Sequence, residues 1–99
     1  GMAEIKWTEE ASTWLKDIFD YIAEENPLAA QRVVEGIYDK TQILKSFPEI
    51  GYKYRKEPEG EIRVLLYGHY RIAYLVKEGS VEILGIFHGS LKIEKYLKK

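Results

Sequence analysis

Residues 62–88, IRVLLYGHYRIAYLVKEGSVEILGIFH, decide the fold of this 99-residue chain. They contain three apolar runs, Ile62–Tyr67, Tyr70–Lys77 and Val81–His88, and short glycine-containing segments separate them. Apolar side chains alternate along the runs, as expected of strands that turn one face toward a core. Gly68-His69 has the composition of a two-residue hairpin turn, in which glycine takes the unusual backbone angles. We therefore expect an antiparallel meander of three strands.

Two helices are expected before this meander. Thr8 is a suitable N-cap for a helix over Glu9–Glu25, and Asn26-Pro27 then begins a second helix that continues to about Ser46. Each helix has an apolar stripe at helical spacing. The stripes comprise Trp14, Leu15, Ile18, Phe19 and Ile22 in the first helix, and Ala30, Val33, Val34, Ile37, Tyr38, Thr41 and Leu44 in the second. Two helices joined this tightly form an antiparallel hairpin.

The remaining segments complete the expected order of elements. Glu4–Trp7 alternates like a short strand, and residues 48–60 have the prolines and glycines of a loop, with a short extended piece around Tyr52–Tyr54. Leu91–Leu97 is expected to form a short terminal helix. The predicted fold is α+β, in the order β-αα-βββ-α, with the helical hairpin on one sheet face. The other face would be partly open or covered by the last helix alone.

Length and composition favour a single intracellular domain. We assign residues 2–99 to one domain and interpret Gly1, ahead of Met2, as a remnant of cloning. The chain has no cysteine, and no apolar run approaches the roughly 20 residues that span a bilayer. We therefore expect a cytoplasmic protein without a membrane partner. Nothing in the sequence indicates a metal or an organic cofactor, and the exposed strand edges and tyrosines are compatible with a homodimer.

The charge balance argues against a protein that binds a phosphate backbone. Fifteen basic and sixteen acidic residues give a net charge of −1, whereas nucleic-acid binding usually requires a basic excess. Positive charge is nevertheless concentrated in two segments, GYKYRK at 51–56 and LKIEKYLKK at 91–99. Each is interpreted either as solvated surface or as part of a contact surface.

Three side chains of the meander are candidates for chemistry. Arg63, Arg71 and His88 lie on three successive predicted strands. If the strand register brings them together, two guanidiniums and an imidazole would bind a phosphate and supply a general acid, as in RNA cleavage through the 2′-hydroxyl. The structural alternatives are that His88 bonds to neighbouring backbone, and that Arg71 pairs with Glu82 or lies over an aromatic ring.

The order of elements and three phrases resemble the RelE/ParE toxin superfamily of bacterial toxin–antitoxin systems. The phrases are SFPEIG after the helical hairpin, RVLLYGHYRIAYLV in the meander and VEILGIFHGS near the end. The resemblance covers residues 5–97 and implies a small toxin that a cognate antitoxin neutralises. RelE-type toxins of this superfamily are ribosome-dependent mRNA endonucleases, whereas ParE-type toxins share the fold and act on DNA gyrase.

The resemblance also implies roles for individual residues. Arg71 matches the strand arginine common to both branches, and His88 matches a histidine found in some nucleases and in ParE-like sequences alike. Gly89 stands where several nucleases have an aromatic residue, and Tyr96 lies outside that spacing. Together with the net charge, this favours a ParE-like toxin that binds protein, with a ribosome-dependent nuclease or an inactive antitoxin-binding relative as alternatives. The expected binding surface comprises Arg63, Arg71, His88, Lys92, Lys95 and Tyr96, extended by Lys98 and Lys99; only a nuclease would make Arg71 and His88 catalytic.

Overall fold

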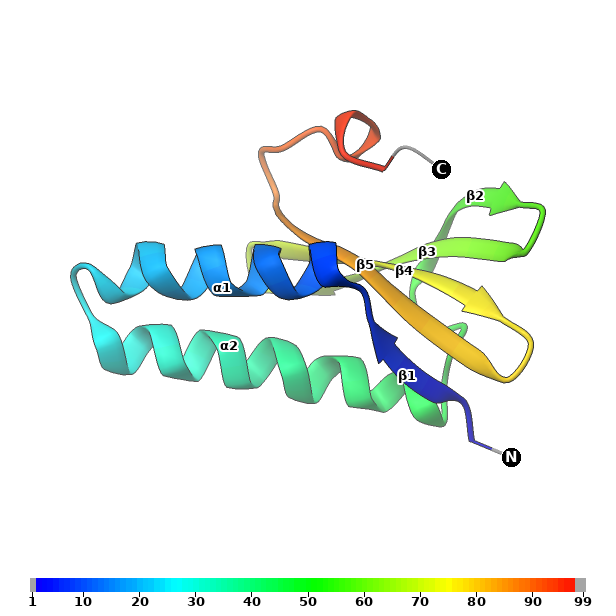
Figure 1. Cartoon of the computed structure of the whole chain (residues 1–99), viewed down its shortest axis with the longest axis horizontal. Helices are drawn as coiled ribbons and strands as arrows, with labels where there is room; N and C mark the ends of the chain where they lie inside the picture. Colours follow the sequence, from blue (N-terminus) through cyan, green and yellow to red (C-terminus); the bar gives the residue numbers. More distant parts are fainter. Residues whose placement is uncertain (1, 98–99) are drawn as a thin grey trace.

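The computed structural model describes residues 2–97, so Gly1, Lys98 and Lys99 lie outside the described part of the chain. Figure 1 shows a helical hairpin packed beside a twisted sheet. The elements in chain order are β1 (Glu4–Trp7), α1 (Glu9–Ala23), α2 (Pro27–Gln42), the 3-10 turn η1 (Ile43–Lys45), β2 (Tyr52–Glu57), β3 (Gly60–Tyr67), β4 (Tyr70–Lys77), β5 (Ser80–His88) and the 3-10 turn η2 (Ile93–Lys95).

The described strands form one mixed sheet in the order β1-β5-β4-β3-β2. The expected meander is confirmed: β3 pairs antiparallel with β4, and β4 pairs antiparallel with β5. β1 joins β5 in parallel. Gly68 has a φ of +56° at the first position of the β3–β4 turn, which a side chain would make costly.

Both predicted helices form, although each is shorter than expected. The Thr8 side chain accepts a hydrogen bond from the Ala11 amide, and Asn26 caps α2 in the same way. α1 ends two residues early, where the Glu25 amide donates only three residues back, to the Ile22 carbonyl, and Asn26 is extended as the N-cap of α2. α2 ends at Gln42, and the chain tightens into η1 before Ser46.

Two hydrophobic clusters lie on opposite faces of the sheet. The helix-side cluster joins the inner faces of α1 and α2 to side chains such as Ile72, Tyr74 and Ile83. The second cluster includes Ala73, Leu75 and Phe87, and its cover comes from Ile93 and Leu97 in the C-terminal segment. The alternation expected within strand 70–77 is therefore observed, and it places Arg71 on the side of the C-terminal segment.

Two sequence-based expectations are corrected by the structure. Residues 52–57, which we expected mostly as loop, form strand β2 along the edge of β3. A bulge between Lys53 and Arg55 interrupts the alternation, which weakens the signal of a strand in the sequence. Residues 91–97 form only the turn η2 instead of a helix, because seven residues give a helix little stability of its own and the Leu91 carbonyl accepts from the Arg71 guanidinium.

Candidate functional site

Arg71 connects β4 to the C-terminal segment, residues 89–97. Its Nη2 donates to the Leu91 carbonyl and lies 3.5 Å from the His88 carbonyl oxygen. Its Nε is buried and has no hydrogen-bond partner among residues 2–97. The pairing with Glu82 that the sequence suggested is not formed, because that carboxylate accepts from Lys77 Nζ at 2.9 Å. The guanidinium is thus used to hold backbone in place.

Arg63 has a comparable role on the other face of the sheet. The residue is 8% exposed, and its Nη1 donates to the carbonyl oxygens of Glu49 at 2.8 Å and Gly51 at 2.7 Å. Its Nε donates to Glu61 at 2.9 Å. The guanidinium therefore fixes the loop before β2, and a buried Arg63 is shielded from an external ligand.

His88 lies exposed at the end of β5. Its Nδ1 is 3.0 Å from the Ser90 hydroxyl and accepts from the Ser90 amide at 3.3 Å. An Nδ1 that accepts from the backbone leaves Nε2 as the protonated nitrogen of the neutral ring. The rings of His69 and Tyr70 pack against His88 at centroid distances of 6.3 Å and 5.8 Å. Burial raises the pKa of Tyr70, with a smaller contribution from Tyr21.

The structure does not bring Arg63, Arg71 and His88 together. Arg63 pairs across the sheet with Tyr74 and His88 pairs with Tyr70, so both lie on the helix side. Arg71 lies on the opposite face. Since Tyr70 and Tyr74 are four residues apart, Arg63 and His88 are separated by roughly 13 Å along the strands alone. A cluster that could hold one phosphate is therefore not assembled.

The C-terminal segment places the remaining predicted binding residues at the surface. Lys92 and Lys95 are exposed, and Tyr96 is 44% exposed while its ring packs against Trp14 and Phe87. The Tyr54 hydroxyl lies 3.3 Å from Glu94 and thereby connects this segment to β2. The two basic segments seen in the sequence are thus neighbours in space. Lys98 and Lys99 lie outside the described residues.

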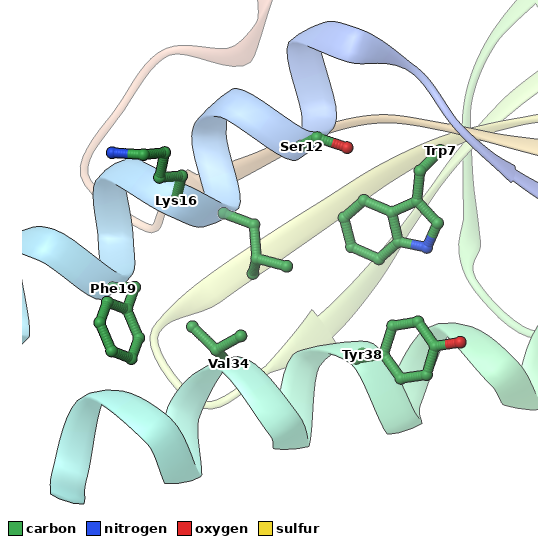
Figure 2. A pocket seen from close by; sticks show the side chains of 7 residues that line it. Trp7, Ser12, Lys16, Phe19, Val34 and Tyr38 are labelled. Atoms are coloured by element: carbon green, nitrogen blue, oxygen red, sulfur yellow. The ribbon is translucent and has the colours of Figure 1, made fainter. Parts of the chain in front are cut away.

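An apolar groove between α1 and α2 was missed by sequence reasoning. It encloses about 450 Å³ and is lined by Trp7, Ser12, Leu15, Lys16, Phe19, Val34 and Tyr38. Figure 2 shows Phe19 and Val34 facing one another across it, with Trp7 and Tyr38 at the other end. Phe19 and Tyr38 belong to the apolar stripes expected from the sequence, but they are 36% and 48% exposed. Two bulky aromatics at the margins of the helical stripes were the available signal.

Among residues 2–97, no group of three or more histidine, cysteine, aspartate or glutamate side chains is arranged to hold a metal ion. No described helix is both long and apolar enough to cross a membrane.

The chain is similar to known proteins in family, sequence and structure. Residues 5–92 match the family described as the ParE toxin of the type II toxin–antitoxin system parDE. Toxin RelE2 of Caulobacter vibrioides is 34% identical over 89 residues, which are 90% of this chain and 98% of that protein.

Several solved structures share the fold of this chain. A chain of the chromosomal ParDE toxin–antitoxin system of P. aeruginosa has a TM-score of 0.72 and 25% identity, covering 88% of this chain and 96% of that chain. A chain of the archaeal RelE–RelB complex of Pyrococcus horikoshii shares the fold, with a TM-score of 0.64 and 15% identity, over 93% of this chain and 100% of that chain. The toxin–antitoxin complex RelBE2 of Mycobacterium tuberculosis likewise shares the fold, with a TM-score of 0.56 and 23% identity, over 89% of this chain and 99% of that chain.

Proposed function

This chain belongs to the ParE toxin family of type II toxin–antitoxin systems, within the RelE/ParE superfamily, and we propose that it acts as a ParE-like toxin by binding a protein target. The proposed target is of the gyrase type that the ParE branch implies, and a cognate antitoxin neutralises the toxin. The observation that carries this proposal is the commitment of Arg63 and Arg71 to internal backbone carbonyls.

A ribosome-dependent nuclease needs cationic groups that reach the scissile phosphate. Here one guanidinium is buried beneath the loop before β2, and the other binds the C-terminal segment from the opposite face of the sheet. His88 is left without a neighbouring arginine side chain on its own face. Gly89 and the net charge of −1 point in the same direction.

Binding to proteins is supported by exposed apolar surface. The groove between α1 and α2 presents Leu15, Phe19, Val34 and Tyr38, and an apolar groove is a surface into which a partner can place an amphipathic helix. Solved relatives from P. horikoshii and M. tuberculosis are complexes of toxin with antitoxin. We assign the corresponding role in this system to a cognate antitoxin, which would bury such a surface.

Induced expression in a bacterial host, followed within minutes by two measurements on the same cells, tests this proposal. One measurement maps mRNA 5′ ends on translated messages, and the other follows the DNA-damage response together with plasmid supercoiling. A gyrase-directed toxin leaves messages intact and activates the damage response. Cuts positioned by codon overturn the proposal, and unchanged growth in both assays indicates an inactive relative that only binds antitoxin.

The ribosome-dependent nuclease is the second candidate. It is favoured by the exposed imidazole of His88, whose Nε2 is directed away from its bonds to Ser90. This alternative requires that Arg71→Ala and His88→Ala abolish cleavage while antitoxin affinity is retained. The matched control is His69→Ala, which removes the neighbouring imidazole from the adjacent turn.

A further inference from the structure

The sheet has two edge strands, and they are covered differently. The start of β1 lies against η1, where the Ala3 amide donates to the Lys45 carbonyl at 2.9 Å. β2 has β3 as its one neighbour in the sheet order, and no strand lies beyond it among residues 2–97. Figure 1 shows β2 on the margin of the molecule, away from the helical hairpin. An edge of this kind presents backbone donors and acceptors to an added strand.

The charge along β2 is predominantly positive. The Lys53 side chain is 69% exposed. Its Nζ lies 4.0 Å from Glu61 Oε2, at the outer limit of an ion pair, so the pairing is weak. Lys56 is exposed as well. The acid of this strand, Glu57, is 9% exposed and is paired with Arg55 at 2.6 Å. The side chains that solvent or a partner meets along this edge are therefore mainly lysines.

The C-terminal segment adds positive charge on the other face of this edge, because Lys53 and Lys56 pair with Arg63 and Glu61 on the helix side of the sheet. The contact between Tyr54 and Glu94 brings residues 92–95 next to β2, with Lys92 and Lys95 both exposed. Exposed aromatic surface accompanies the lysines, because Tyr52 and Tyr96 are 49% and 44% exposed. Backbone edge, positive charge and tyrosine rings thus occur together on one margin of the sheet.

We infer that the free edge of β2 binds an extended, acidic segment of a partner protein, which pairs with β2 as a sixth strand. A second copy of the same edge would place lysines against lysines, and like charges on paired strands are unfavourable. Lysines on an edge strand oppose indiscriminate pairing, yet they attract a strand that carries carboxylates. Naming the partner as the antitoxin rests on the proposed function, whereas the pairing chemistry of the edge does not.

A synthetic peptide tests the edge without any knowledge of the partner. The probe has about ten residues that alternate glutamate with valine, so that all its glutamates lie on one face when the peptide is extended. We expect it to bind and to slow amide hydrogen exchange of residues 52–57, and its affinity should fall as salt rises. Equal binding of a peptide with lysine in place of glutamate would overturn the inference, as would protection confined to other strands.

Two matched variants separate edge charge from overall charge. Lys53→Glu and Lys6→Glu each reverse an exposed lysine on an edge strand, and each lysine is loosely paired with a glutamate, at 4.0 Å and 3.8 Å. Lys53→Glu should weaken peptide binding about two- to fivefold, the scale of one partly exposed ion pair. Lys6→Glu, on the opposite edge, should change it less than about twofold. Equal effects of the two variants would mean that only net charge matters.

The same exchange measurement on the antitoxin complex assigns the partner. Antitoxin encoded beside the toxin gene is co-purified with the full chain, and amide exchange is compared with that of the free toxin. Protection of residues 52–57 supports the antitoxin as the sixth strand. A stable complex without that protection overturns this assignment but leaves the proposed function intact. Failure of the two proteins to associate contradicts the proposed function itself, and the peptide result stands separately.

Discussion

The two faces of the sheet bury similar side chains but differ in what holds their covers in place. α1 and α2 cover one face with two capped helices that also pack on each other. Residues 89–97 cover the other face with a single 3-10 turn, two buried anchors in Ile93 and Leu97, and the guanidinium of Arg71. The first cover is supported by many independent contacts, whereas the second depends on a few.

The largest expected effect comes from truncating one isoleucine in each cluster. Ile83 and Ile93 are 0% and 1% exposed. Ile83→Ala should lower the free energy of unfolding by about 2–5 kcal/mol, because the helices hold the cavity open. Ile93→Ala should lower it less, since residues 89–97 can detach before the sheet unfolds. Urea unfolding followed by circular dichroism measures both losses, and equal losses would show that the two covers unfold as one unit.

Removal of Arg71 tests the polar anchor of the weaker cover. Arg71→Ala loses the charged hydrogen bonds to the Leu91 and His88 carbonyls, with an expected cost of about 1.5–3 kcal/mol. Amide exchange in residues 89–97 should accelerate more than in α1. Arg32→Ala, at an exposed residue of α2, is the control and should leave both the free energy of unfolding and the amide exchange of residues 89–97 unchanged. If Arg71→Ala abolishes toxicity while amide exchange is unaltered, Arg71 contacts the protein target or an mRNA and does not anchor residues 89–97.

The helix-covered face was largely predictable from sequence because its signals are local. Caps at Thr8 and Asn26, helical spacing and the two glycine turns each report on a few neighbouring residues. The other face depends on contacts between distant residues, such as Tyr54 with Glu94 and Arg71 with Leu91. β2 was missed because its bulge and its lysines hide the alternation of a strand.

The candidate site was harder to predict because it depends on register. Sequence places Arg63, Arg71 and His88 on successive strands, but a shift of one residue exchanges the two faces of a sheet. Pairing of Arg63 with Tyr74, and of Arg71 with Leu66, assigns the two arginines to opposite faces. The backbone carbonyls that receive these guanidiniums have no side-chain signature. The two arginines could therefore be named as candidates, but their partners could not.

The helix-covered side also has a polar anchor, at Tyr74. Its hydroxyl accepts a hydrogen bond from the Gly51 amide at 2.9 Å, in a buried setting. Tyr74→Phe leaves that amide without a partner and should lower the free energy of unfolding by about 1–3 kcal/mol. Tyr21→Phe, at a residue that is 77% exposed, is the matched control and should have no measurable effect. A neutral Tyr74→Phe would indicate that the loop before β2 is held by Arg63 alone.

The same variant alters the dependence of stability on alkaline pH. Burial raises the pKa of Tyr74 above its ordinary value of 10.0. The neutral phenol is thus favoured in the folded protein, so this contribution is complete below about pH 10 and is lost as pH rises through the raised pKa. Tyr74→Phe should therefore lose stability less steeply above pH 10 than the unaltered protein. Parallel curves of unfolding free energy against pH would contradict this origin.

Charge reversal at exposed basic residues should have the smallest effect on stability. It therefore distinguishes residues that are needed for binding from residues that are needed for folding. Lys92 and Lys95 are exposed on the C-terminal segment, so Lys92→Glu with Lys95→Glu should change the free energy of unfolding by less than about 0.5 kcal/mol and leave the melting temperature unchanged. Antitoxin binding or toxicity should nevertheless weaken, because both lysines lie beside the basic edge of β2. The matched pair Arg32→Glu with Lys6→Glu makes the same charge change at two exposed residues away from the C-terminal segment. If both pairs leave binding and toxicity unaltered, the C-terminal cover is not part of the contact surface; if both weaken them equally, net charge and not the position of the lysines governs association.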